Sequence, residues 1–194
     1  GYALDAQWND DFRHCVHSLL TKEDKGYYED FGTLEQMAKA IKEGFVYSWD
    51  YSQFRKRYHG NSSANILPSK LVVFSQNHDQ VGNRMKGERL SALVSFEALK
   101  VAAGITLLSS NVPLLFMGEE YGEDAPFLYF MSFHDEQLIK AVREGRKKEF
   151  SSFDWQGERE DPYEKSTFLK SKLQWDKIKT DKNRVLLEYY KKLI

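Results

Sequence analysis

The spacing of apolar residues along the chain predicts several amphipathic helices. Apolar side chains that recur every three or four positions are typical of a helix with one buried face. The pattern predicts helices over residues 8–20, 34–45, 96–109, 136–148 and 183–194. Thr33 and Gln36 form a capping-box pair before the second helix, and Ser95 is expected to cap the third. The third helix is apolar on most of its faces, so we expect it to be well buried.

Two short apolar runs predict buried strands, at residues 70–75 and 112–117. Continuous apolar runs of this length are typical of strands in a parallel sheet, and Pro113 lies near a strand start, where a missing N–H is tolerated. The order strand, helix, strand, helix favours a parallel α/β arrangement. Residues 46–65 are expected to form a loop, as is most of the polar segment 150–180.

Composition narrows the protein class. The chain has 194 residues, enough for one domain but short of the ~250 of a complete (β/α)8 barrel. Hydrophobic residues make up 41% and charged residues 29%, a globular balance, and the net charge of −1 gives no case for nucleic acid or anionic membrane. No apolar run approaches the ~18 residues of a membrane span. The single cysteine, Cys15, fits a reducing, cytoplasmic compartment.

Polar residues follow both predicted strands. Asn77, His78 and Asp79 come directly after the first, and the C-terminal ends of barrel strands carry active sites. A carboxylate there can stabilise the positive charge of a sugar-hydrolysis transition state, although a buried His–Asp pair is also often structural. Glu119 and Glu120 follow the second strand. Adjacent residues of an extended chain face opposite ways, so one is expected to face the site and the other outward.

Other charged residues allow weaker interpretations. His14 and His17 are three residues apart on a predicted helix, a spacing that a metal site or an ordinary polar helix face can use. The basic clusters at 84–89 and 143–148 lack phosphate-loop spacing and are expected to be solvated, except for Arg84, which lies close to Asp79.

The run 74–79, Phe-Ser-Gln-Asn-His-Asp, resembles the seventh-strand motif of the α-amylase superfamily. Segments 5–12, 80–84, 116–122, 142–146, 166–168 and 171–173 narrow this resemblance to the maltooligosyltrehalose trehalohydrolase family. The resemblance covers essentially the whole chain. Glucan branching enzymes, which share the strand-seven and strand-eight motifs, are the nearest alternative.

The resemblance implies a partial (β/α)8 TIM barrel. Residues 1–194 would form the C-terminal portion of the catalytic barrel, roughly strands six to eight. The implied enzyme is a retaining glycoside hydrolase that cleaves the α-1,4 bond next to trehalose in a maltooligosaccharide with a trehalose end. It uses water and needs no metal or organic cofactor.

The resemblance also implies roles for single residues. Asp79 would be the transition-state stabiliser and His78 its hydroxyl-binding neighbour, and Glu120 would help to shape the mouth of the site. The remaining candidates for substrate binding, several on the trehalose side, are Asn77, Gln80, Arg84, Trp8 and Asp10.

Two catalytic carboxylates of the family are not matched. The nucleophilic aspartate ends strand four and the acid/base glutamate ends strand five, whereas residues 5–8 resemble the strand-six region. Both would lie before Gly1, so we expect the isolated chain to be inactive. A three-strand segment of a barrel leaves open edges, so we expect self-association or association with the remainder of the barrel. The segment 161–165 is also less acidic than the family pattern.

Two other classes remain open from the sequence. Metal-dependent phosphohydrolases use separated histidines with a His–Asp pair, which His14, His17, His78 and Asp79 superficially match. In those folds the pair lies on a helix, whereas here it follows an apolar, β-rich run. The aromatic residues in predicted loops would also suit a non-catalytic sugar-binding module, because flat rings stack on sugars.

Overall fold

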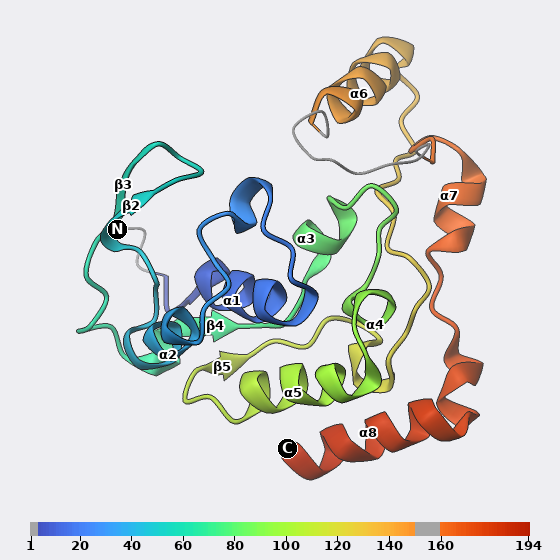
Figure 1. The fold of residues 1–194 in the computed structure, drawn as a ribbon. Coiled ribbons are helices and arrows are strands. Elements are labelled where there is room, and N and C mark those ends of the chain that lie inside the picture. The colour runs from blue at the N-terminus through green and yellow to red at the C-terminus, as the bar shows by residue number, and fades with distance from the viewer. Residues whose placement is uncertain (1–3, 150–159) are drawn as a thin grey trace.

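A three-stranded parallel sheet lies at the centre of the part of the chain that the computed structural model describes, residues 4–149 and 160–194. Its order is β1 (Gln7–Trp8), β4 (Leu71–Val73), β5 (Val112–Pro113), as Figure 1 shows. Both neighbouring pairs are parallel. The α/β class and the parallel sheet predicted from the order of elements are therefore confirmed.

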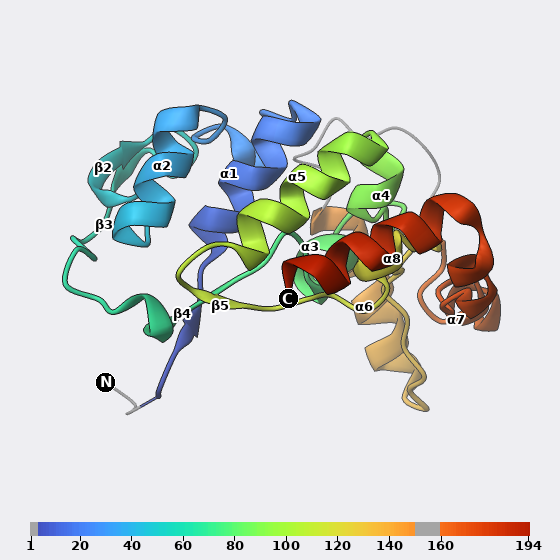
Figure 2. The ribbon, with the colours of Figure 1, turned by 90° about the horizontal axis from the view of Figure 1, so that it is seen from below.

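Three helices lie along one side of the strands: α1 (Asp10–Thr21), α2 (Leu34–Glu43) and α5 (Phe96–Leu107), as Figure 2 shows. The last helix, α8 (Asp181–Leu193), packs against α5. The main core joins α1, α2, β4 and α5 and includes the buried side chains of Phe12, Val16, Met37, Val73 and Ala102. Burial of these apolar side chains is the main force that holds the helices on the sheet.

The helix starts agree with the caps expected from the sequence. Thr33 and Gln36 make both hydrogen bonds of the capping box, at 3.2 and 3.1 Å, and Ser95 Oγ accepts from Ala98 N at 3.2 Å. Asn9 caps α1 in the same way, with its Oδ1 accepting from Phe12 N at 3.1 Å. These side chains satisfy backbone donors that the first helical turn leaves free.

The remaining elements are short, except for α6. The helices are α3 (His78–Gly82), α4 (Leu90–Leu93), α6 (Glu136–Glu149) and α7 (Lys165–Lys170), and the 3-10 turns are η1 (Gly26–Tyr28), η2 (Pro68–Lys70), η3 (Glu119–Tyr121) and η5 (Trp175–Lys179). Both strands predicted from apolar runs are shorter than expected, because strand pairing ends at Val73 and Pro113 and the chain then turns. Among the described residues, no helix combines the length and apolar character needed to cross a membrane.

The loop predicted for residues 46–65 is wrong, because this segment contains an antiparallel hairpin. Strands β2 (Ser48–Ser52) and β3 (Arg57–Gly60) pair with Tyr51 opposite Tyr58. The carboxylate of Asp30 fastens the hairpin from another part of the chain, accepting from Tyr47 Oη at 2.7 Å and from Gln53 N at 2.6 Å. Distant side chains, which a local pattern does not reveal, therefore stabilise the hairpin.

Two further expectations need correction. The segment 160–180 contains α7 and η5 rather than only loop; residues 150–159 lie outside the described residues. Helix α5 is only partly buried: Ala102, Ala103 and Thr106 are enclosed, while Val101 is half exposed. The enclosed side packs on the core and on α8.

A partly buried ion pair ties the end of α1 to the segment after α3. Arg84 donates to both carboxylate oxygens of Glu23, Nη1 to Oε2 and Nη2 to Oε1, each at 2.8 Å. His17 Nε2 lies 2.8 Å from the same carboxylate, and its ring stacks on Tyr28. Burial alone would raise the pKa of Glu23, but the hydrogen bonds from His17 and Arg84 lower it to about 2.

The buried carboxylate of Glu119 has a pKa shift in the opposite direction from that of Glu23. Glu119 lies beneath α8, where its Oε2 is 3.3 Å from Ser75 Oγ and its Oε1 is 3.5 Å from Tyr190 Oη. Burial raises its pKa to about 8, although hydrogen bonds from Phe116 N, Gln76 and Ser75 act to lower it. The Glu119 carboxyl is thus largely protonated at neutral pH.

Replacing Glu23 by Gln should destabilise the fold by on the order of 2–3 kcal/mol at pH 7, because Arg84 loses its buried counter-charge. The pKa of Glu23 is about 2 in the folded chain against an ordinary value of 4.5. Its contribution is therefore present above pH 4.5 and lost as the pH falls toward 2. Urea denaturation at several pH values should show the difference between wild type and Glu23→Gln narrowing below pH 4.5. The neighbouring exposed Asp24→Asn is the control, and an equal loss there would contradict the prediction.

Replacing Glu119 by Gln should change how stability depends on pH in the other direction. Its pKa is about 8 when folded and 4.5 ordinarily, so unfolding becomes easier as the pH rises between these values. The free energy of unfolding should fall by up to ~1.4 kcal/mol for each pH unit in this range. Glu119→Gln should remove this decline, whereas the partly exposed neighbour Glu120→Gln should keep most of it. Denaturation midpoints between pH 5 and 8 test this; parallel curves for wild type and Glu119→Gln would refute it.

Candidate active site

Residues at and just beyond the ends of β1 and β4 meet at one edge of the sheet, because parallel strands end on the same side. The ring of Trp8 lies 5.6 Å from that of His78 at 73°, and 5.6 Å from that of Phe74 at 68°. Gln80 Nε2 donates to Asp10 Oδ1 at 3.0 Å. Trp8, Asp10, His78, Asp79 and Gln80 therefore form one group, the polar edge.

The His–Asp pair follows β4, as the sequence predicts, but it lies in the first turn of α3 and not at the end of an extended run. Asn77 is the N-cap of α3, and its Oδ1 accepts from Asp79 N at 3.0 Å and from Gln80 N at 3.2 Å. His78 Nε2 is 3.2 Å from Asp79 Oδ1, and their side chains are 56% and 57% exposed. Both side chains are thus open to a ligand, while the buried Asn77 shapes the backbone that carries them.

The polar edge offers a carboxylate, an imidazole and an indole side by side. The indole of Trp8 is partly exposed, so its ring can stack on a flat apolar face of a ligand. Carboxylate and imidazole can form hydrogen bonds with hydroxyl groups, and the carboxylate attracts developing positive charge. This combination suits the binding of a sugar ring.

Arg84 lies behind the polar edge. Its guanidinium is buried and donates two hydrogen bonds to the carboxylate of Glu23. The carboxylate oxygen Oε2 of Glu88 lies 3.4 Å from Arg84 Nε. The guanidinium of Arg84 contacts Glu23 and Glu88. In this structure Arg84 therefore supports the polar edge by holding α1 and the segment after α3 together. The expectation that the cluster 84–89 is solvated is wrong for Arg89, which is buried; Arg84, which that expectation excepted, is buried as well.

Glu119 and Glu120 lie on the 3-10 turn η3 and not in an extended run, and they differ in burial; that one of them faces the site stays a prediction. Glu119 is the buried one, and Glu120 is partly exposed. Gly118 precedes the turn with φ +85°, and a Cβ there would lie 2.8 Å from the Cβ of Glu123. The turn thus requires glycine, and it leaves Glu120 as the carboxylate accessible from solvent.

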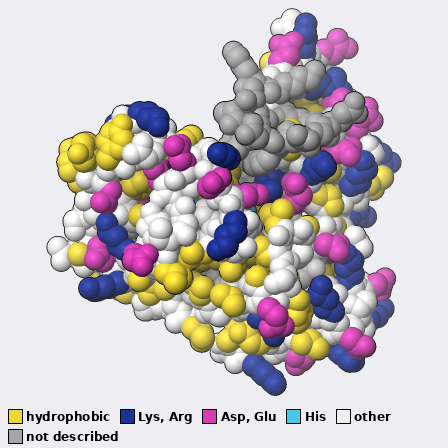
Figure 3. Space-filling model, in the orientation of Figure 1, with side chains coloured by type: hydrophobic (Ala, Val, Ile, Leu, Met, Phe, Trp, Pro, Cys, Tyr) yellow, Lys and Arg dark blue, Asp and Glu magenta, His cyan; other side chains and the backbone are white. Residues whose placement is uncertain are grey.

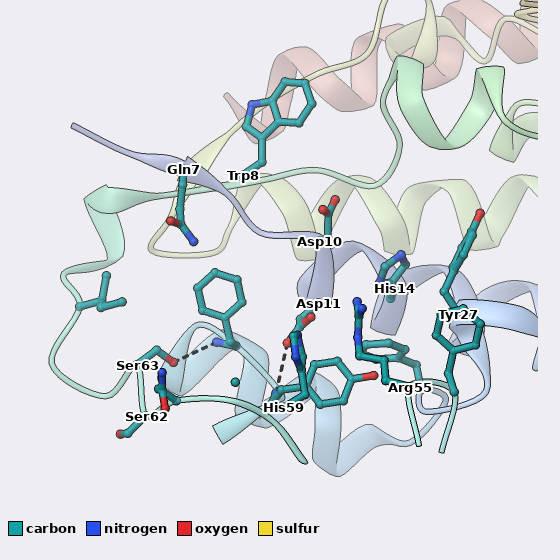
Figure 4. A pocket seen from close by; sticks show the side chains of 17 residues that line it. Gln7, Trp8, Asp10, Asp11, His14, Tyr27, Arg55, His59, Ser62 and Ser63 are labelled. Atoms are coloured by element: carbon teal, nitrogen blue, oxygen red, sulfur yellow. Dashed lines mark hydrogen bonds between the residues drawn. The ribbon is translucent and has the colours of Figure 1, made fainter. Parts of the chain in front are cut away.

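A pocket of about 490 Å³ lies beside the polar edge and shares Trp8 and Asp10 with it. Figure 4 shows Trp8 and Asp10 pointing to the opposite side of the β1–α1 connection from Asp11. The volume is within the range of small-ligand sites. Polar and aromatic side chains from α1, η1 and the hairpin line the pocket, among them Asp11, His14, Tyr27, Arg55 and His59.

The polar groups of the pocket are held in place. Asp11 Oδ2 accepts from Val46 N at 2.8 Å and from Tyr47 N at 3.1 Å. Burial raises the pKa of Asp11 despite these two hydrogen bonds. Burial and the nearby charge of Arg13 lower the pKa of His14 well below its usual range, which favours a neutral ring at the pocket wall.

The two histidines of α1 do not come together with His78 as metal ligands would. His17 is buried against Tyr28 and Glu23, and His14 packs among Tyr27, Tyr28 and Phe31. Within residues 4–149 and 160–194, no group of three or more His, Cys, Asp or Glu side chains is arranged to hold a metal ion.

Two residues that organise the site were missed from the sequence. Glu23 lies in a short charged run that carries no motif. Arg89 is buried, donates to the carbonyls of Ala125 and Met117 at 2.7 Å each, and lies over the ring of Phe116. It therefore fixes the loop after β5 next to η3. Only the three-dimensional partners distinguish these side chains from solvated charges.

No family model matches the chain. Curated proteins named malto-oligosyltrehalose trehalohydrolase do match it over its whole length. The identity is 49% with the protein from Saccharolobus solfataricus, 47% with that from Brevibacterium helvolum and 37% with that from Mycobacterium tuberculosis. The chain covers 33%, 33% and 34% of these relatives, so it spans about a third of their length.

A solved structure is similar to this chain in its fold. A crystal structure from Salmonella typhimurium, described as an alpha amylase, superposes on 97% of this chain with a TM-score of 0.89 and 43% identity. The chain covers 32% of that protein. Over its whole length the chain is therefore similar in sequence to proteins named malto-oligosyltrehalose trehalohydrolase, and it corresponds to about one third of such a protein.

Proposed function

We propose that this chain is part of a retaining glycoside hydrolase that releases trehalose from maltooligosyltrehalose by cleaving the adjacent α-1,4-glucosidic bond. The observation that carries the proposal is the polar edge, where Asp79 and His78 stand exposed beside Trp8. The names of relatives up to 49% identical over the whole chain support trehalohydrolase as the reaction, rather than the transfer catalysed by a branching enzyme.

In this proposal Asp79 stabilises the transition state. Hydrolysis with retention passes through states in which the sugar ring carries oxocarbenium-like positive charge, and a fixed carboxylate lowers their energy. His78 binds a hydroxyl of the same sugar, and Trp8 packs edge-on against the imidazole, which restricts its orientation. Gln80 and Asp10, already joined by a hydrogen bond, would bind the trehalose side.

The other two catalytic carboxylates would come from outside these residues. A retaining mechanism needs a nucleophile and an acid/base about 5–5.5 Å apart. We assign them to the remaining two thirds of a complete enzyme, and the sheet β1–β4–β5 to strands six to eight of its (β/α)8 barrel. The outer strands β1 and β5 would then pair with further strands of the same barrel. A cytoplasmic location stays a prediction from the single cysteine, which is free and buried.

Replacing Asp79 by Asn in the complete enzyme should lower kcat by about 10²–10³-fold, because an amide lacks the charge that stabilises the transition state. The KM should change little, since the substituted side chain keeps its size and hydrogen-bonding capacity. Steady-state release of trehalose from maltooligosyltrehalose measures both constants. Asp176→Asn, an exposed carboxylate paired with Lys179 at 2.6 Å, is the matched control. Unchanged kcat in Asp79→Asn would refute the proposed role.

The isolated 194-residue chain should release no trehalose, because one supporting carboxylate cannot replace a nucleophile and an acid. Its open sheet edges should also make it associate with itself. Chromatographic detection of trehalose and sedimentation velocity test the two statements. Trehalose release by this chain alone would contradict the first, and a monomer with a sharp, high-temperature unfolding transition would contradict the second.

A further inference from the structure

The hairpin β2–β3 carries three exposed aromatic rings on one face. Trp49, Tyr51 and Tyr58 are 66%, 47% and 58% exposed. The rings of Trp49 and Tyr58 are nearly parallel, at 17° with centroids 5.9 Å apart, and Tyr51 stands edge-on to Tyr58 at 78° and 5.6 Å. Figure 3 shows a cluster of hydrophobic side chains over the hairpin, at the upper left. These three residues are called the aromatic platform.

The opposite face of the hairpin is anchored to the body. Asp50 accepts from Lys39 Nζ at 3.0 Å and from Ser48 N at 2.7 Å. The side chain of Ser52 is buried and bonded to Asp30, and the ring of His59 packs on Tyr47. The hairpin is thus a fixed support, and the platform faces solvent although its underside is packed.

Trp49 adopts a backbone conformation that is unfavourable for its residue type. Its φ is +73°, in the left-handed region, at the irregularity between Ser48 and Asp50. A residue with a Cβ is disfavoured there, and glycine is the usual occupant. Two thirds of the Trp49 side chain remain in solvent, so burial does little to compensate. Strain that local packing does not compensate points to a functional role.

We propose that the aromatic platform binds an α-1,4-linked glucan chain, in addition to the sugar bound at the polar edge. The identity of the sugar rests on the proposed function. A glucosyl unit has an apolar C–H face that can stack on the free face of the indole, and the phenol groups of Tyr51 and Tyr58 can hydrogen-bond its hydroxyls. The edge-on ring beside the stacked pair forms a corner, which suits a curved chain better than a flat surface would.

The size of the platform argues against a protein partner. Each ring buries at most ~150–250 Å². Three partly exposed rings therefore fall short of the ~800 Å² that a standard protein interface buries on each partner. A nucleic acid is the other class to test, because Arg55, Lys56 and Arg57 lie in and beside the hairpin turn. Lys56 is 4.0 Å from Glu29, Arg55 lines the pocket, and Arg57 pairs with Ser52 on the face of the hairpin opposite Tyr58. These charges therefore do not form a track along the rings.

Maltoheptaose is the probe, since it lacks a trehalose end and its binding is measured without the proposed hydrolysis. Maltoheptaose is titrated into the complete enzyme, and binding is followed by calorimetry and tryptophan fluorescence. The Kd for maltoheptaose should lie below roughly 10 mM. Trp49→Gly should raise this Kd by about tenfold or more, the size of a stacking contact with a flat ligand. Glycine accepts the left-handed backbone, so the denaturation midpoint of Trp49→Gly should stay unchanged or rise. Trp49→Phe should retain part of the binding.

Trp175→Ala removes a tryptophan of similar exposure in η5 and should leave the Kd unchanged. The proposal is overturned if the wild-type protein does not bind maltoheptaose, or if the Trp49→Gly variant binds it as tightly as the wild type. A lower denaturation midpoint of the Trp49→Gly variant would also overturn it. Salt-sensitive binding of oligothymidylate that displaces maltoheptaose would also overturn it. If maltoheptaose binding depends on Trp49 but the complete enzyme releases no trehalose, this inference is upheld and the proposed function is rejected. If the complete enzyme releases trehalose but maltoheptaose does not bind, the proposed function is upheld and this inference is rejected.

Discussion

The parallel pairing of β1 with β4 and of β4 with β5 is the constraint on which the other features depend. Parallel strands end at the same edge of a sheet, so the residues that follow β1 and β4 must meet there. Trp8 consequently packs against His78, and Asp10 receives the hydrogen bond of Gln80, although about 70 residues separate the partners along the chain. If β1 shifted by one residue, Trp8 would turn to the other face and this grouping would be lost.

Buried charges then hold the connecting segments at that edge. Arg84 and Glu23 join the segment after α3 to the end of α1, and Arg89 holds the loop after β5 through the carbonyls of Ala125 and Met117. Buried charges of this kind are stable only while every partner is present. The sheet therefore sets where the polar edge lies, and these ion pairs and hydrogen bonds determine how rigidly it is held.

The hairpin contributes to two candidate binding surfaces of the chain, the pocket and the aromatic platform. Its inward side, with His59, closes the pocket next to Asp11, while its outward side carries Trp49 and Tyr58. A substrate made of repeated glucosyl units needs several contacts along its length, and the chemistry that we propose for Asp79 would use only one of them. A polar edge, a pocket of about 490 Å³ and an aromatic platform on one chain are consistent with the proposed long saccharide substrate.

Local patterns in the sequence were sufficient for much of this description. They predicted the α/β class, the parallel sheet and the caps at Thr33 and Ser95, because periodicity and capping depend on neighbours a few residues apart. They also placed His78 and Asp79 directly after a strand, whereas the roles of these two residues stay predictions. Tertiary structure decided the rest. Arg84 and Glu119 are buried, and residues 48–60 form a hairpin, through partners that are distant in sequence: Glu23, Tyr190 and Asp30. No local pattern records such partners, since burial and hydrogen bonding depend on which segments the fold brings together.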